Sequence, residues 1–219
     1  MPLILSGNVA SAIGGGYNVD NSLRLNAADD AFLSRAVDLT QGTTSQHKFT
    51  ISCWFKIGSS AITNGELFGA YGSNDFFTIR VNASGAIDVL SYDNAIKGRL
   101  ITNELIRDPS AWYNLVFHCD TNDGTGGDRM RLWLNGTEIT SFATDTHPSS
   151  GADLIAENDD TFAIGKNIDQ SGNVGEFDGY IAEFVYIDND TLAASSFGEF
   201  DEDSPTIWKP IDVSGLTFG

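Results

Sequence analysis

Short segments rich in aromatic and β-branched residues recur along the chain, and clusters of glycine, asparagine, aspartate and serine separate them. This spacing is typical of an antiparallel sandwich or barrel, and no stretch has the sustained period of a long helix. The segments predicted to be strands are 22–25, 31–35, 48–57, 66–71, 76–82, 86–92, 99–102, 112–119, 129–134, 137–141, 161–165 and 180–188. Because all-β sandwiches of about 200 to 250 residues form one domain, the 219 residues are expected to fold around one core.

Turn chemistry marks two hairpins and three exposed loops. The hairpin turns are predicted at Asn82 to Gly85 and at Asn135-Gly136, because these residue types accept the backbone angles of tight turns. Polar, glycine-rich stretches at 72–75, 120–128 and 145–160 are predicted to be loops. Loops on a rigid sandwich carry specificity at little cost to the core, so a ligand is expected there.

The two ends of the chain differ from the middle. Residues 1–20 are predicted to form an N-terminal arm, in which Gly14 to Gly16 act as a hinge, and residues 21–219 to form the sandwich. Two fates of the arm stay open, pairing along its own sheet edge or reaching a neighbouring subunit. Its apolar run is too short for a signal peptide or a membrane span. The last 20 residues are expected to wrap the sandwich with Trp208 as an anchor.

Acidic residues outnumber basic ones by 30 to 12, which gives a formal net charge of -18. Such a surface repels phosphates and anionic lipids, so neither nucleic acid nor a membrane is expected as a partner. The chain has two cysteines, Cys53 and Cys119, which excludes a disulfide scaffold. Buried free thiols are expected, and one bridge stays open if their strands are neighbours.

Several stretches resemble the laminin-G-like, concanavalin A-type jelly-roll proteins that occur among tailed bacteriophage virion genes. FTISCWFKIG at 49–58 and DRMRLWLNGTEIT at 128–140 carry the general likeness, and RDPSAWY at 107–113 and SSFGEFDE at 195–202 the more specific one. The resemblance extends over about residues 20 to 219. It implies a jelly-roll β-sandwich of two antiparallel sheets and a structural virion component, such as a tail fibre, head fibre or capsid decoration protein.

Partners and location follow from the same resemblance. The arm is expected to contact capsid or tail proteins, or sister subunits in a homo-oligomer, within a virion that assembles in the host cytoplasm. Free cysteines agree with that compartment. The alternative is a carbohydrate-binding or adhesin module that recognises host-surface glycans through the three loops. Fold alone does not decide between these functions.

Some concanavalin-like proteins are glycoside hydrolases, which need a pair of carboxylates facing one groove. The best match here is Glu176, Asp178 and Glu183, but in a continuous strand the odd offset turns Glu183 away from the other two. The three histidines lack zinc spacing, and no nucleophile turn or phosphate-binding loop occurs. No catalytic residue and no enzymatic activity are therefore predicted.

Glu183 also raises a question of its own. In a continuous strand it shares a face with Ile181, Val185 and Ile187, so its carboxylate needs a compensating partner. The partner is expected to be Arg24 or Arg35, backbone amides, or a calcium ion shared with Asp29 and Asp30. The family resemblance favours calcium near such a turn. Asp29, Asp30 and Glu183 are therefore the candidate metal ligands, and calcium is the candidate cofactor.

Aromatic side chains are candidates for stacking on sugar rings. The candidates within or beside predicted strands are Trp54, Trp112, Trp133 and Tyr180. The simpler expectation is that these are core residues, and the alternation of apolar residues favours burial for Trp54 and Trp133. Tyr71 and Tyr92 are predicted to be exposed at loops and are the better sugar-binding candidates.

Overall fold

The computed structural model describes residues 17–36, 47–60, 64–72, 75–154, 161–168 and 175–217. Their regular structure consists of strands and three short 3-10 helices, at Ala27–Asp29, Gly126–Asp128 and Ala194–Ser196. The strands are β1 (Leu23–Leu25), β2 (Leu33–Ala36), β3 (Lys48–Ile57), β4 (Gly65–Tyr71), β5 (Asp75–Val81), β6 (Ala86–Asp93), β7 (Ala95–Leu105), β8 (Tyr113–Asp120), β9 (Met130–Leu134), β10 (Thr137–Glu138), β11 (Phe142–Thr146), β12 (Thr161–Ile164), β13 (Gly179–Asp188), β14 (Gly198–Phe200) and β15 (Trp208–Pro210).

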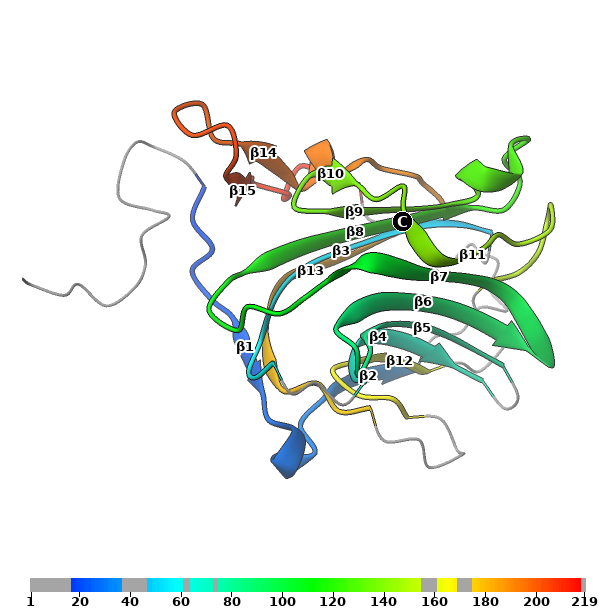
Figure 1. The fold of residues 1–219 in the computed structure, drawn as a ribbon, viewed down its shortest axis with the longest axis horizontal. Helices are drawn as coiled ribbons and strands as arrows, with labels where there is room; N and C mark the ends of the chain where they lie inside the picture. The colour runs from blue at the N-terminus through cyan, green and yellow to red at the C-terminus, as the bar shows by residue number, and fades with distance from the viewer. Residues whose placement is uncertain are drawn as a thin grey trace, which may run out of the picture.

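Two antiparallel sheets form the two layers of a sandwich (Figure 1). One sheet has six strands in the order β1-β13-β3-β8-β9-β10, and the other has seven in the order β11-β7-β6-β5-β4-β12-β2. The predicted all-β jelly roll of two antiparallel sheets is confirmed. Strands far apart in sequence lie next to each other, as β3 does between β13 and β8.

The core between the sheets is built from rings. Phe49, Phe55 and Phe117 of the six-stranded sheet and Phe68 and Phe77 of the seven-stranded sheet are at most 2% exposed. Phe49 meets Phe77 edge to face across the sandwich, with ring centroids 5.5 Å apart, a geometry that aromatic pairs prefer. These contacts fix the spacing of the two sheets and thereby the position of the loops at their ends.

Both predicted hairpins are present. At Asn82 to Gly85 the amide of Gly85 donates to the carbonyl of Asn82, 2.8 Å away, and Gly85 has φ +86°. At Asn135-Gly136 both residues are left-handed, with φ 48° and 76°, as a two-residue hairpin turn requires. The strand boundaries agree closely in the middle of the chain, where Lys48–Ile57 was predicted without error.

Three strands were missed. β11 lies at the edge of its sheet and carries a polar sequence, and β14 and β15 are three residues each and pair only with one another. Short edge strands lack the apolar alternation on which a strand prediction depends. β15 lies within the last 20 residues, for which no strand was predicted.

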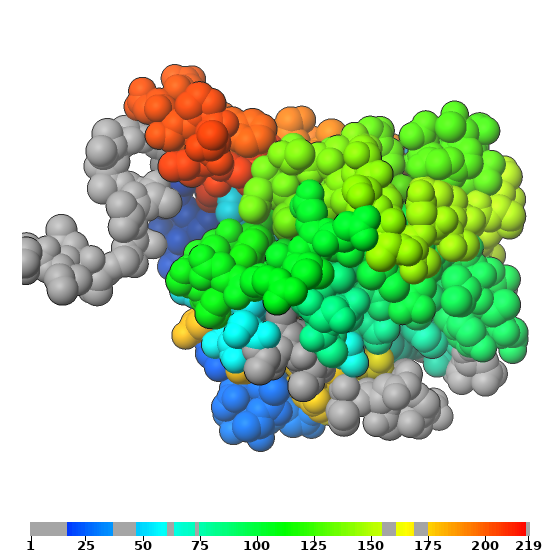
Figure 2. Space-filling view, viewed as in Figure 1, coloured from blue at the N-terminus to red at the C-terminus, as the bar shows by residue number. Residues whose placement is uncertain are grey.

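The C-terminal segment covers part of the outer face of the six-stranded sheet. Val116, Trp133, Val185 and Ile187 on that face pack with Ala194 and Phe197, in a second apolar cluster that Trp208, Val213 and Leu216 join. Trp208 Nε1 donates to Asn114 Oδ1, 3.0 Å away. In Figure 2 the red C-terminal residues lie against the yellow-green hairpin of β9 and β10. Trp208 therefore anchors the segment, as predicted.

Cys53 and Cys119 are buried free thiols, as expected. Cys53 lies opposite Leu115, whereas Cys119 lies opposite Phe49, so the two cysteines occupy different levels of the β3–β8 ladder. Burial raises the pKa of the Cys53 thiol to about 12. In the part of the chain that the structure describes, no helix has the length and apolar character to cross a membrane.

Candidate functional site

Three loops that are far apart in sequence meet at one end of the sandwich, on the right of Figure 1. The amide of Gly151 donates to the carbonyl of Thr121, 3.0 Å away. Arg129 Nη1 donates to the carbonyl of Pro148 at 2.9 Å. Residues 149–154 then share the lining of a cavity with Asp75 at the start of β5. The described parts of the loops predicted at 72–75, 120–128 and 145–160 are thus neighbours in space.

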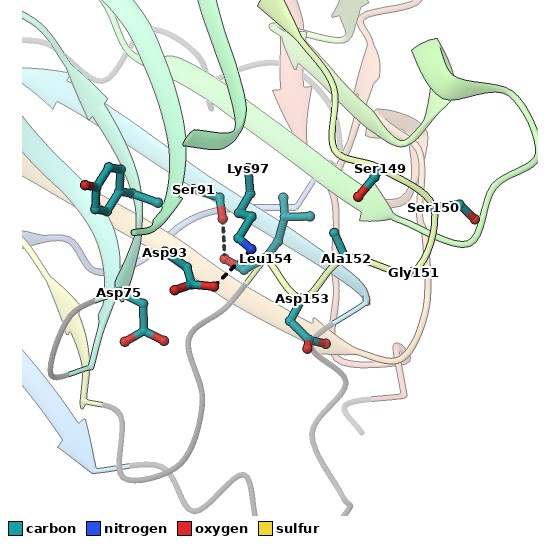
Figure 3. Close-up of a pocket in the computed structure, with 11 residues that line it drawn as sticks. Asp75, Ser91, Asp93, Lys97, Ser149, Ser150, Gly151, Ala152, Asp153 and Leu154 are labelled. Atoms are coloured by element: carbon teal, nitrogen blue, oxygen red, sulfur yellow. Dashed lines mark hydrogen bonds and ion pairs between the residues drawn. The ribbon is translucent and has the colours of Figure 1, made fainter. Parts of the chain in front are cut away.

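The cavity has a volume of about 240 Å³. One wall is formed by Asp75 and by the β6–β7 turn, which contributes Ser91, Asp93 and Lys97, and the other by residues 149–154 (Figure 3). In Figure 3 the carboxylates of Asp75 and Asp93 lie across from that of Asp153, and Lys97 lies between the two walls. The space suits one or two sugar-sized groups rather than a large ligand.

Negative charge prevails in the cavity. Three aspartates line it against one lysine. Lys97 Nζ lies 3.0 Å from Asp93 Oδ2, and this hydrogen bond, supported by one from Asn94, holds the pKa of Asp93 below its usual value. On the other wall, His47 Nδ1 lies 3.2 Å from Asp153 Oδ1. The carboxylates therefore keep fixed positions and offer several acceptor oxygens to a ligand.

The loop that forms the second wall is bonded to β6 and within itself. Ser91 Oγ donates to the carbonyl of Leu154 at 2.8 Å, and inside the loop the amide of Ala152 donates to the carbonyl of Ser149 at 3.2 Å. Between them Gly151 has φ +73°, a conformation that favours glycine. A wall held by backbone contacts loses little conformational entropy when it binds a ligand.

Comparison with known families identifies the fold. A laminin-G model described as the concanavalin A-like lectin/glucanases superfamily matches residues 29–194. The chain belongs to this superfamily. No curated protein sequence matches it.

Solved structures of the superfamily agree with the fold. Domains LG4-5 of the mouse laminin alpha1 chain have a TM-score of 0.54 at 12% identity, over 98% of this chain and 50% of that one. The CBM40 of the Ruminococcus gnavus IT-sialidase has a TM-score of 0.54 at 14% identity, over 83% and 96%. Domain 4 of the Geobacillus stearothermophilus arabinanase AbnA, in complex with arabinotriose, has a TM-score of 0.51 at 15% identity, over 80% and 84%. This chain thus spans about half of the laminin LG4-5 structure, and the likeness concerns the fold alone.

The candidate metal ligands lie toward opposite ends of the β1–β13 ladder. Asp29 and Asp30 follow Leu25, which pairs with Gly179, whereas Glu183 lies beyond Ile181, which pairs with Leu23. Asp30 forms an ion pair with Lys166, and Asp29 Oδ2 accepts a hydrogen bond from Asn26. Among the described residues, no three His, Cys, Asp or Glu side chains are grouped as metal ligands. The structure therefore does not bring Asp29, Asp30 and Glu183 together.

Glu183 differs from its predicted environment because its strand is not continuous. It has φ 46°, and the register with β3 shifts between Ala182 and Val185, which identifies a β-bulge. The bulge turns Ile181 toward the core between the sheets while Val185 and Ile187 face the C-terminal segment. Glu183 is half-buried beside that segment, and Tyr17 donates a hydrogen bond of 3.2 Å to Oε2. Glu183 thus shares the outer face with Val185 but not with Ile181, so the expected shared face was wrong for Ile181.

The other predicted carboxylates have partners of their own. Arg24 binds Asp178, with 2.7 Å between Nη2 and Oδ1, rather than Glu183 as expected, and Arg35 is exposed. Glu176 Oε1 lies 3.9 Å from Lys166 Nζ. Both carboxylates thus face cations.

The aromatic candidates divide into buried and exposed residues. Trp54 and Trp133 are buried, as expected. Tyr71 was predicted to be exposed, but it is 5% exposed and its hydroxyl donates to Glu66 Oε1 at 2.7 Å. Tyr92 was also predicted to be exposed, but it is half-buried. It lines the cavity, and its ring stacks on that of Phe76 with centroids 5.4 Å apart.

Two residues of the cavity, Asp93 and Lys97, were not identified from the sequence. The strand at 99–102 was predicted to start too late, whereas β7 begins at Ala95 and follows a tight turn at Asn94 with φ 53°. Asp93-Asn94 is a turn signal of the kind used for the other hairpins. Recognising it would have placed both side chains at the same end as the three loops.

Proposed function

We propose that the chain is a non-catalytic carbohydrate-binding module and that it binds a neutral glycan in the cavity at the loop end. The supporting observation is a polar cavity that two of the predicted loops and the β6–β7 turn line with Asp75, Asp93 and Asp153. Carboxylate oxygens accept hydrogen bonds from sugar hydroxyls.

Charge favours a neutral sugar over an acidic one. Three aspartates against one lysine leave the cavity negative, and the chain as a whole carries -18. A sialic or uronic acid would bring a like charge to this site, which costs free energy at short range. The arabinanase domain in complex with arabinotriose supports the same class of ligand, because arabinotriose is an uncharged oligosaccharide.

The test begins with a glycan array and continues with calorimetry on the best ligand. Asp93→Asn and Asp153→Asn keep the shape of the cavity and remove charge-assisted hydrogen bonds, so each is expected to weaken binding by about tenfold or more. Asp203→Asn, at an exposed carboxylate outside the cavity, is the matched control and should bind like the parent protein. Unchanged affinity in both cavity variants would contradict the proposed site.

Calcium is tested in the same experiment. The resemblance led us to expect a calcium ion near Asp29 and Asp30, and calcium stays a prediction. The array is therefore run with calcium and with a chelator. Binding that disappears only with the chelator would support a cation requirement, and equal binding would count against it.

A second proposal is the assembly of this module into a virion through residues 1–20. It depends on the sequence resemblance at 107–113 and 195–202. The hinge and residues 1–16 lie outside the described residues. Deletion of residues 1–16 should leave the sandwich folded and abolish its incorporation into particles or homo-oligomers in the host cytoplasm. Unchanged incorporation would contradict the role of the arm.

A further inference from the structure

Two large aromatic side chains are exposed side by side at the end of the sandwich opposite the cavity. Trp112 is 39% exposed and Tyr180 is 37% exposed. Their ring centroids are 6.4 Å apart and their planes are inclined by 57°. Adjacent exposed aromatics on a soluble protein are a sign of a binding surface, because leaving them in water forgoes favourable burial.

The position of the pair follows from strand register. Tyr180 is the second residue of β13 and lies opposite Lys56 of β3, and Trp112 directly precedes β8, whose Tyr113 lies opposite Phe55. The cavity wall at 149–154 lies near the other end of β8, because the amide of Gly151 donates to the carbonyl of Thr121, directly after β8 ends at Asp120. The Trp112–Tyr180 pair is therefore a separate surface on the outer side of the six-stranded sheet.

Tyr180 is held in place by a charged neighbour. Arg24 Cζ lies 5.2 Å from the centroid of the Tyr180 ring, a cation–π distance. The guanidinium is fixed in turn by Asp178 Oδ1 at 2.7 Å and by the carbonyl of Gly179 at 3.2 Å. One face of the ring is thus occupied by Arg24, and the ring orientation is set before any ligand arrives.

The backbone before Trp112 forms a compact turn. Asp108 Oδ1 accepts hydrogen bonds from the amide of Ser110 at 2.8 Å and from its hydroxyl at 2.6 Å. The amide of Asp108 donates to Tyr113 Oη at 3.2 Å, which ties the start of the turn to β8. An ordered backbone at Trp112 and a Tyr180 ring beside Arg24 reduce the entropy lost on binding.

The charges around the two rings balance. Arg24 is cationic and is bound by Asp178. Hydrogen bonds from Ser110 lower the pKa of Asp108, and the positive charge of Lys56 lowers it further. A balanced rim gives no electrostatic advantage to a charged ligand. It does provide donors and acceptors at the edges of an apolar platform, which matches a sugar ring with its C–H face and its hydroxyl rim.

We propose that Trp112 and Tyr180 form a second binding site for neutral pyranosides, independent of the cavity. A protein partner fits less well, because a stable protein interface buries about 1,600 Å² in total, far more than two partly exposed rings provide. A module with one site at each end would bind two sugar chains, or two stretches of one chain, and would gain avidity on polysaccharides.

The test observes Trp112 directly by its indole N–H signal in two-dimensional NMR spectra of the full chain, assigned with Trp112→Phe. The probes are cellohexaose, xylohexaose and mannohexaose, with sialyllactose as the acidic comparison. At least one neutral hexasaccharide is expected to shift the Trp112 signal with saturation, and sialyllactose is not.

Variants separate the two sites. Trp112→Ala and Tyr180→Ala should weaken the binding at this end by about tenfold, whereas Tyr180→Phe should retain it, since the ring remains. Ile207→Ala, at an apolar side chain that is 52% exposed elsewhere, is the matched control. Asp153→Asn should leave the Trp112 shift unchanged, so failure of the cavity proposal does not affect this result.

Three outcomes would overturn the proposal. No shift of the Trp112 signal with any neutral probe would do so, as would a shift that persists in Tyr180→Ala. A Trp112 signal that moves with protein concentration instead of sugar would show that the rings contact a second copy of the chain.

Discussion

The outer face of the six-stranded sheet has a covered half and an open half, and both carry large aromatic residues. Under the C-terminal segment, Trp54 and Trp133 are 7% and 6% exposed. Beyond its reach, Trp112 and Tyr180 are 39% and 37% exposed. Aromatic side chains of the same sheet are therefore buried in one half and exposed in the other. The difference follows from the segment at 192–216, which covers only one half.

This difference means that strand pattern alone does not tell a structural aromatic from a binding one. In the covered half, rings make contacts that contribute to folding, and substitutions there should reduce stability. In the open half, rings make few such contacts, and substitutions should affect binding. The largest effects on stability are therefore expected from substitutions in the covered half.

Trp133→Ala should destabilise the fold by about 3–5 kcal/mol, the usual cost of truncating a buried tryptophan. The ring packs against His118, with centroids 4.8 Å apart, and against the second apolar cluster. Trp112→Ala should cost less than about 1 kcal/mol, because its side chain is well exposed. Denaturant unfolding of both variants measures the contrast. Equal losses would contradict the division into covered and open halves.

Much of the fold could be predicted from the sequence, because alternation and turn residues are local signals. The ten residues of β3 and the turn at Asn135-Gly136 are examples. The bulge at Glu183 could not be predicted, since one left-handed residue inside an otherwise regular strand leaves no local mark and turns the following residues over. The exposure of Trp112 also depends on a segment some eighty residues away in sequence.

Gly136→Ala should cost about 3 kcal/mol, from left-handed strain together with overpacking. Gly136 has φ 76°, and an added Cβ would overlap the ring of Trp208, which forms part of the cover. Gly151→Ala is the matched control at the loop end. It has φ 73°, but the heavy atom nearest to an added Cβ would be Asn122 Oδ1 at 3.7 Å, so this substitution should cost about 1 kcal/mol. Similar losses of stability for the two variants in thermal unfolding would show that Trp208 does not pack tightly against this turn.

Trp208→Phe should cost about 1–2 kcal/mol, because it keeps most of the apolar ring and removes one donor. Trp208 Nε1 donates to Asn114 Oδ1, and Asn114 is fully buried, so its oxygen would lose a partner. Asn114→Ala combined with Trp208→Phe completes a double-mutant cycle in denaturant unfolding. Strictly additive losses would mean that this hydrogen bond does not hold the C-terminal segment.

The candidate site was partly predictable for similar reasons. Loop chemistry indicated the stretches at 72–75, 120–128 and 145–160, and the sandwich brings their described parts to one end. Asp93 and Lys97 were missed because they flank a turn within an underestimated strand. Tyr71 was predicted to be exposed, but its ring lies over Gly69 and its hydroxyl donates a hydrogen bond to the buried Glu66. Such long-range packing has no counterpart in local sequence.

The smallest expected effect concerns pH and the edge of the covered half. Burial lowers the pKa of His118 below its usual value of 6.5, and its Nδ1 lies 3.3 Å from the carbonyl of Leu192. The unfolded chain therefore binds a proton at His118 more readily than the folded chain does. The stability gained from neutral His118 is fully present above pH 6.5 and is lost as the pH falls through the lower folded pKa.

Denaturant unfolding of the parent protein and of His118→Gln at pH 7.5, 6 and 5 measures this loss, because the two proteins differ only at His118. The parent should lose more stability than the variant on acidification, by the smallest margin of this series. Parallel pH profiles would indicate that the C-terminal segment leaves His118 open to water, and the covered half would then be smaller than the second apolar cluster suggests.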